Sequence, residues 1–144
     1  MSEVDKQKLR RIPLEALNEG RIEVVDEVVS EDYVERADTP GFSPDREGLK
    51  GFIAAVRTAF PDLKYTVIKE ISEGDTLVQY VTASGTMKGA FGDMKPTGKH
   101  ATWEEVHIVR IEGGLAVEHW GVQDQLGMLQ QLGLAPAPGI SRAA

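Results

Sequence analysis

Apolar residues in the first part of the chain recur at helical spacing. Residues 2–18 are rich in helix formers, and Pro13 must lie at a kink or at a junction between two helical pieces. Gly20 then suits a left-handed C-terminal cap. Residues 21–29 carry a short amphipathic stripe, and Tyr33 beside it is expected in the core region. The pattern therefore predicts helices from the start of the chain to about residue 29.

A third helix is predicted after the loop of residues 37–44. Ser43, Pro44 and Asp45 resemble a helix start, with Ser43 as the capping hydroxyl. One continuous stripe follows and ends at Pro61; it consists of Leu49, Phe52, Ile53, Val56 and Phe60. The preceding loop, with its prolines and glycine, is expected to border the mouth of a cavity.

The second half of the chain reads as strands. Four extended segments cover approximately residues 63–71, 76–91, 99–111 and 115–124, separated by glycine-rich turns. They predict an antiparallel meander, which curls because strands of this length twist. A closing helix with Leu126, Met128, Leu129 and Leu132 is predicted to end at Gly133. Helices first and strands second indicate an α+β fold.

The last hairpin sets which side chains share a face. Gly113-Gly114 suits a two-residue turn, which places Glu112 opposite Leu115. Regular alternation from that turn predicts one inner face containing Trp103, Glu105, His107, Val109, Glu118, Trp120, Val122 and Asp124. The opposite face would contain Val106, Ile108, Arg110, Val117 and His119.

Asp124 and His107 are the candidate catalytic residues. Aromatic walls beside ionisable groups raise a carboxylate pKa and make it a usable base near neutrality. Two structural alternatives stay open: Asp124 precedes the closing helix and suits an N-cap, and His107 suits a half-buried sheet position. His119, on the other face in this register, is expected at an outer or interface position.

The other candidate pocket residues are mostly apolar. They are Trp103, Trp120, Glu105, Phe52, Val56, Phe60, Tyr33, Met87, Phe91 and Met128. Large aromatic residues dominate protein cores, so a core position is the more common role for both tryptophans. Met87 and Phe91 suit either a flexible pocket wall or a subunit interface.

The amino-acid composition excludes several kinds of partner and of catalytic or metal site. The 144 residues fit one core, and a formal charge of −7 disfavours a nucleic-acid partner. Cysteine is absent, which removes thiol nucleophiles and thiolate metal sites, and the histidine spacing predicts no metal. No apolar run reaches membrane-spanning length, so we expect a cytoplasmic protein without a membrane partner. Residues 1–134 form the predicted domain and residues 135–144 a flexible tail.

Several segments together resemble one family. The chain is similar to the SnoaL-like polyketide cyclases, also called ester cyclases, of the NTF2-like superfamily, across residues 5–134. The segments that carry the resemblance are 85–91, 95–99, 107–111, 117–124 and 131–134. It implies a cone made by a curved antiparallel sheet, about three amino-terminal helices and a short carboxy-terminal helix.

The resemblance also implies an activity. Characterised cyclases of the family close a polyketide ring by intramolecular aldol condensation, without metal or cofactor. It implies that Asp124, at the end of the last strand, is the general acid–base and that His107 supports it. The fold also hosts other functions, so two alternatives stand: a noncatalytic small-molecule-binding or dimerisation module, and an epoxide hydrolase or ketosteroid-isomerase-like enzyme.

A homodimer or higher homo-oligomer is expected. The outer face of a curled sheet, here with Val106, Ile108 and Val117, is apolar and needs to be covered. The partners predicted from the sequence are thus a small-molecule substrate or ligand and further copies of the chain.

Overall fold

A five-stranded sheet with helices on one face organises the protein. The computed structural model describes residues 1–137. The elements are α1 (Glu3–Arg11), η1 (Ile12–Leu17), α2 (Glu23–Val28), β1 (Val29–Glu35), α3 (Arg46–Ala59), β2 (Lys64–Glu73), β3 (Thr76–Thr86), β4 (His100–Glu112), β5 (Leu115–Gln123) and α4 (Gln125–Leu132). The predicted α+β class is confirmed.

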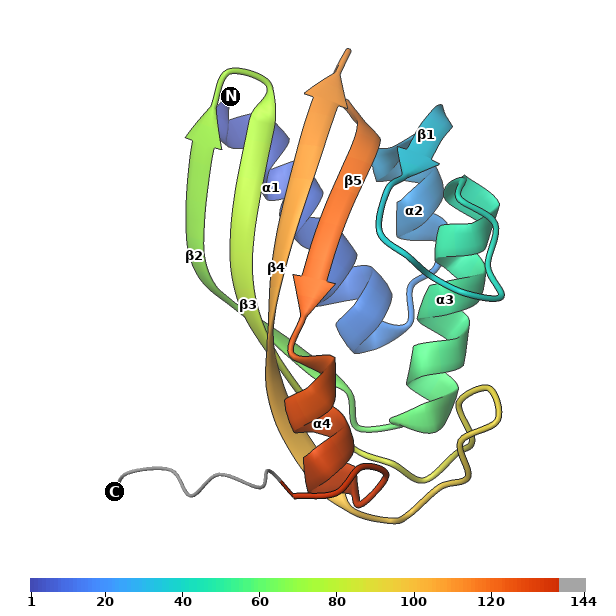
Figure 1. Ribbon diagram of the computed structural model, residues 1–144. Helices are drawn as coiled ribbons and strands as arrows, with labels where there is room; N and C mark the ends of the chain where they lie inside the picture. Colours follow the sequence, from blue (N-terminus) through green and yellow to red (C-terminus); the bar gives the residue numbers. More distant parts are fainter. Residues whose placement is uncertain (138–144) are drawn as a thin grey trace.

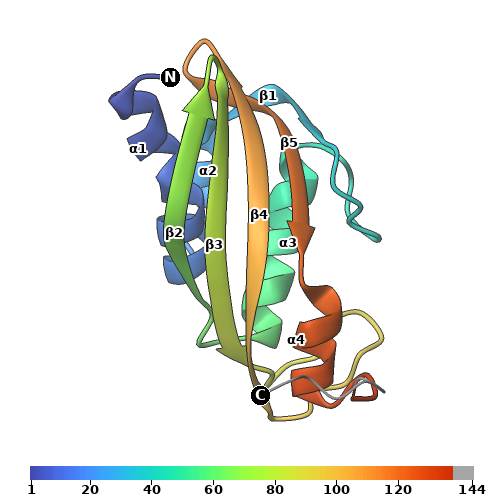
Figure 2. The same cartoon turned by 60° about the vertical axis from the view of Figure 1, so that its left-hand side comes forward.

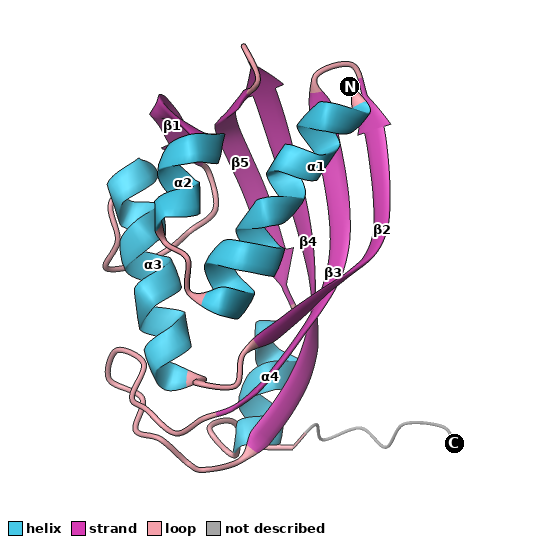
Figure 3. Ribbon diagram, turned by 180° about the vertical axis from the view of Figure 1, so that it is seen from behind, coloured by secondary structure: helices cyan, strands magenta, loops and turns pink. Residues whose placement is uncertain are grey.

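The sheet has the strand order β1-β5-β4-β3-β2 and curves along its length (Figures 1 and 2). Strands β2 to β5 form the predicted antiparallel meander, whereas β1 pairs with β5 in parallel. Seen from behind, α1, α2 and α3 lie over one face of the sheet (Figure 3). α4 follows β5 at one end. A helix-covered inner face and a bare outer face result.

The amino-terminal helices follow the sequence signals. Ser2 caps α1 by accepting the amide of Asp5 at 3.1 Å. Pro13, which has no amide hydrogen, lies at the start of η1, a π-helical segment that continues α1. Gly20 has a φ of 73°, as the predicted left-handed cap requires. The junction at Pro13 and the stop at Gly20 are therefore confirmed.

Two local predictions need correction. Residues 29–35 form strand β1, which the meander of four strands did not include. α3 begins after Asp45, whose carboxylate accepts the amide of Gly48 at 2.9 Å. Asp45 and not Ser43 is thus the N-cap, because Ser43 donates its hydroxyl to the Asp45 carboxylate.

A bulge in β5 changes the predicted register. Glu112 pairs with Leu115 as expected, but the ladder then shifts between Ile111 and Arg110, and Val117 has no partner on β4. Beyond it, His107 lies opposite Gly121 instead of Trp120. A one-residue insertion exchanges the two faces of all following positions. His119 consequently points inward, and Trp120, Val122 and Glu118 point outward.

The core fills the space between the helices and the inner face of the sheet. Five of the predicted pocket residues are buried there and do not line the cavity: Val56, Phe60, Met87, Trp103 and Met128. The rings of Phe60 and Trp103 lie 5.5 Å apart. Met87, Met128 and Trp103 therefore pack in the core and do not form a pocket wall.

The described part of the chain covers most of the predicted domain. Residues 138–144, most of the predicted tail, lie outside the described residues. Within residues 1–137, no helix has the length and apolar character needed to cross a membrane.

Candidate active site

A cavity of about 510 Å³ opens between the helices and the inner face of the sheet. Its helical wall is apolar and includes Leu9, Ile12, Leu49, Phe52 and Ile53. Residues of the 37–43 loop border it, as expected from the prolines there. The sheet wall carries the polar groups. The arrangement opposes an apolar wall to a polar one, as small-molecule sites commonly do.

Four side chains on the sheet wall form a continuous hydrogen-bonded line. Glu105 Oε1 lies 2.7 Å from His107 Nε2, and His107 Nδ1 lies 2.8 Å from His119 Nε2. His119 Nδ1 lies 2.5 Å from Glu35 Oε2. We call these four residues the carboxylate–imidazole chain. It links β4, β5 and the end of β1.

The inner end of this chain is deeply buried. Glu105 is 5% exposed and accepts hydrogen bonds from Trp103 Nε1 at 2.7 Å and from the Tyr65 hydroxyl at 3.0 Å. Burial alone would raise the pKa of Glu105, but the hydrogen bond and charge of His107, with the Trp103 and Tyr65 hydrogen bonds, bring it below its ordinary value. Burial also raises the pKa of Tyr65, which stays a donor.

The outer end has a similar construction near the cavity mouth. Glu35 accepts the Tyr33 hydroxyl at 2.9 Å and the amide of Ala37 at 3.2 Å. Burial raises the pKa of Glu35, yet the hydrogen bond and charge of His119 outweigh it and lower the pKa overall. Both ends of the chain are therefore ionised carboxylates that accept hydrogen bonds.

Gly121 makes room for the two imidazoles. A Cβ atom at this position would lie 2.9 Å from His119 Cε1 and 3.2 Å from His107 Nδ1. We predict that Gly121→Ala separates the rings and lowers the free energy of unfolding by about 1–3 kcal/mol, as overpacking usually does. Histidine NMR reports the separation of the rings, and urea unfolding measures the free energy of unfolding. An unchanged imidazole spectrum would contradict the prediction.

The buried carboxylates predict loss of stability in acid. Their pKa values are lower in the folded state, so the unfolded chain binds protons first as pH falls. The free energy of unfolding should fall as pH drops below about 4.5, the ordinary value, and towards the lowered folded values. Glu105→Gln should flatten this dependence, whereas Glu73→Gln, at an exposed site, should not. Chemical denaturation at a series of pH values tests both.

The structure brings together part of the predicted site. The cavity wall includes Tyr33, Phe52, Phe91, Glu105 and His107. Trp120 is 39% exposed on the outer face, so its predicted inward position is wrong.

Asp124 lies outside the cavity wall. Its side chain is exposed and accepts the amide of Gly127 at 2.9 Å as the N-cap of α4. The predicted position beside His107 is wrong, because the bulge at Val117 reverses the faces of β5. The structural alternative, a helix cap, describes this residue. Its catalytic role stays a prediction.

Sequence reasoning missed three residues of the hydrogen-bonded network on this wall. His119 was assigned to the other face, and neither Glu35 nor Tyr65 was considered. With the bulge in β5 taken into account, the alternation of side chains would have placed His119 on the inner face. Glu35 had no local signal, since its position depends on pairing between β1 and β5, far apart in the sequence.

The geometry of the polar wall does not resemble a metal site. Within residues 1–137, no three histidine, aspartate or glutamate side chains converge as metal ligands would. The four groups of the carboxylate–imidazole chain follow one another in a line, and all four ring nitrogens are hydrogen-bonded. Such an array is suited to holding and moving protons.

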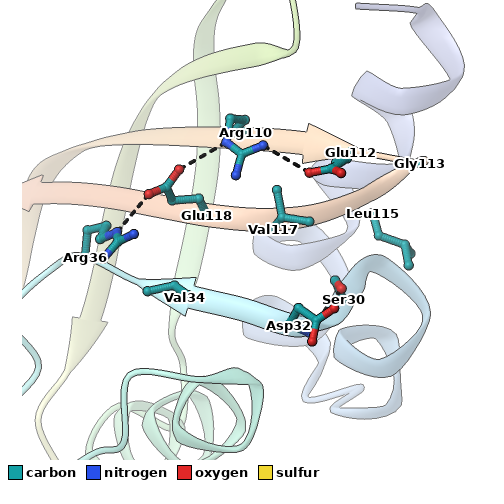
Figure 4. A pocket seen from close by; sticks show the side chains of 10 residues that line it. All are labelled: Ser30, Asp32, Val34, Arg36, Arg110, Glu112, Gly113, Leu115, Val117 and Glu118. Atoms are coloured by element: carbon teal, nitrogen blue, oxygen red, sulfur yellow. Dashed lines mark hydrogen bonds and ion pairs between the residues drawn. The ribbon is translucent and has the colours of Figure 1, made fainter.

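A second hollow, of about 420 Å³, lies on the outside of the sheet beside β1 (Figure 4). Arg36 and Arg110 both bind Glu118, at 2.8 and 3.0 Å, and Arg110 also binds Glu112. Glu118 therefore joins the two arginines across β5, β4 and the end of β1. These exposed ion pairs contribute little individually. The hollow lacks the buried acid–base groups of the inner cavity.

Comparisons with known proteins agree on one family. The model of the SnoaL-like polyketide cyclase family matches residues 7–132. The nogalonic acid methyl ester cyclase of Streptomyces nogalater is 28% identical over 120 residues, covering 82% of this chain and 90% of that protein. The aklanonic acid methyl ester cyclase DnrD of Streptomyces peucetius is 30% identical over 132 residues, covering 87% and 88%.

A solved structure confirms the architecture. TsrD from Streptomyces laurentii superposes with a TM-score of 0.84 at 29% identity, covering 94% of this chain and 99% of that one.

Proposed function

The chain belongs to the SnoaL-like polyketide cyclase family, and we propose that it closes a ring in a polyketide-like substrate by an intramolecular aldol reaction, without a cofactor. The single observation that carries this proposal is the carboxylate–imidazole chain on the polar wall of an otherwise apolar cavity. Similarity to two methyl ester cyclases supports the reaction class.

His107 is the proposed acid–base group. Its side chain is 26% exposed, whereas Glu105 behind it is almost fully buried. Nε2 is bound to Glu105 and Nδ1 to His119, so Nδ1 exchanges a proton with the substrate when the contact between the two rings opens. The ring takes a proton from a carbon between two carbonyl groups; the resulting enolate attacks another carbonyl carbon of the same molecule; and the new alkoxide takes the proton back.

The apolar wall supplies the rest of the catalysis. The Phe42 and Phe52 rings lie 5.7 Å apart and the Phe52 and Phe91 rings 6.3 Å apart, in edge-to-face contact near the mouth. They would hold a flat, partly aromatic substrate and exclude water from the enolate. Holding both reacting carbons together lowers the entropic part of the barrier.

Aklanonic acid methyl ester and nogalonic acid methyl ester are suitable probes. Ring closure converts either compound into an isomer of the same mass, so chromatography with mass spectrometry and NMR follows the reaction. Accelerated closure of at least one compound supports the proposal. Tight binding of both with no acceleration would contradict it and favour the noncatalytic binding module.

A further prediction separates His107 from Asp124. Asparagine is also a good N-cap, so Asp124→Asn should preserve α4 and change the free energy of unfolding by less than about 1 kcal/mol. The rate of ring closure should stay within a few-fold of the parent. A loss of several orders of magnitude in stopped assays of substrate conversion would instead assign the proton transfer to residue 124.

We also propose that two copies associate through the outer face of the sheet. Ile108 pairs with Trp120 there, Val106 pairs with Val122, and Val122 is 72% exposed. Covering such a face in a two-fold dimer removes apolar area from water. Light scattering during size exclusion should give twice the chain mass, and Val122→Glu should give a monomer. A monomeric parent would contradict this proposal. The cytoplasmic location stays a prediction.

A further inference from the structure

We propose that His107 and His119 share one proton and act as a single acid–base unit, with Glu35 as the positioning residue at its outer end. The inference deepens the proposed function and rests on it for the catalytic part. Only the catalytic part depends on the substrate, because the shared proton is a property of the protein itself.

The donor and acceptor roles in these hydrogen bonds determine how many protons the two imidazole rings carry. An ionised carboxylate only accepts, so His107 must present Nε2–H to Glu105 and His119 must present Nδ1–H to Glu35. A neutral imidazole has one N–H. Two neutral rings would therefore direct two lone pairs at each other across the 2.8 Å contact between Nδ1 and Nε2. Two doubly protonated rings would direct two N–H groups at each other. One bridging proton satisfies both nitrogens.

The charges around the cavity favour this extra proton. The charged side chains in the described cavity wall are Glu35, Asp38, Glu105, His107 and His119, and no lysine or arginine is among them. Tyr33 and Tyr65 face the two carboxylates as neutral donors. Among the described residues, the ion pairs of Glu105 and Glu35 are with these two imidazoles, so the bridging proton supplies the charge that pairs with the buried carboxylates, and an unpaired buried charge would be costly.

A shared proton changes what each residue does in the reaction. The bridging proton passes to the carbonyl oxygen beside the reacting carbon while the pair takes that carbon's proton, so the enolate of the proposed reaction is held as its enol. As the enol carbon attacks the second carbonyl carbon, the pair protonates the new alkoxide and takes back the enol proton, which restores the starting state. One proton leaves the pair and one returns. His119 and Glu35 determine how readily His107 releases and recovers it.

Histidine NMR tests the shared proton directly. With [¹⁵N]histidine in a His100→Gln background, only His107 and His119 give imidazole signals, because the chain has three histidines. Long-range ¹H–¹⁵N correlations should show both rings responding to one common titration, with His107 Nδ1 and His119 Nε2 at intermediate shifts. Two independent titrations, or a signal showing that Glu35 or Glu105 carries the proton, would overturn the inference.

Kinetics of the variants test the catalytic part. Glu35→Gln should lower kcat by about 10²-fold, at the lower end of acid–base contributions, with little change in KM and with a displaced pH profile. Glu31→Gln is the matched control, since Glu31 lies on the same strand with a side chain 87% exposed. Unchanged kcat and pH profile in Glu35→Gln would overturn the role of Glu35. If the parent converts neither ester while its rings titrate together, the shared proton stands and only the proposed reaction fails.

Discussion

Replacing His107 by glutamine is expected to slow ring closure by about 10²–10⁴-fold, the usual contribution of a general acid–base group. Glutamine can still hydrogen-bond Glu105 but cannot take up and return a proton near neutral pH. Substrate affinity should change little, because the aromatic wall formed with Phe52 and Phe91 is untouched. Rates of conversion of the methyl ester probes at saturating concentration measure the effect.

His100→Gln is the matched control for this substitution. His100 lies on the same strand, at its exposed start, and contacts Thr86 at 3.0 Å. Its replacement should leave the rate unchanged. Equal losses in both variants would indicate general damage to β4, and full activity in His107→Gln would remove His107 from the mechanism.

Replacing Glu105 by alanine is expected to cause the largest loss of stability. Three buried or half-buried donors, on Trp103, Tyr65 and His107, would lose their acceptor. Each unsatisfied buried group costs about 1–3 kcal/mol, and the truncation leaves a cavity as well. We expect the free energy of unfolding to fall by roughly 3–5 kcal/mol, which is a large part of the total for a domain of this size.

Glu104→Ala is the matched control for Glu105→Ala. Glu104 is the preceding residue, is exposed on the other face of β4, and accepts the Tyr80 hydroxyl. Its loss should cost about 0–1 kcal/mol. Urea unfolding of both variants at neutral pH provides the test. Similar losses at the two positions would show that the buried hydrogen bonds of Glu105 contribute little.

The sequence predicted the elements better than the contacts between them. Helical stripes, the proline at residue 13 and the glycine turns are local signals, and they located most helices and strands. The face on which a strand residue lies depends on every residue between it and the turn. One unpaired residue, Val117, was therefore enough to exchange His119 with Trp120.

The candidate site could be predicted only in part for the same reason. Glu105 and His107 lie on β4, which has no bulge opposite β3, so their shared face followed from alternation alone. Glu35 required knowledge of a parallel strand pair. The inner half of the carboxylate–imidazole chain, Glu105 and His107, could thus be predicted from one strand. The outer half, Glu35 and His119, could not be predicted from local sequence.

The parallel pairing of β1 with β5 has a consequence for when the active site forms. Glu35 and His119 are separated by 84 positions along the chain, so their contact requires closure of a long loop. Contacts of this kind slow folding, because the chain loses entropy before it gains stabilisation. During synthesis, β1 is completed early but waits for almost the whole remaining polypeptide. Catalytic competence should therefore be acquired among the last steps of folding, after the β2–β4 meander has formed.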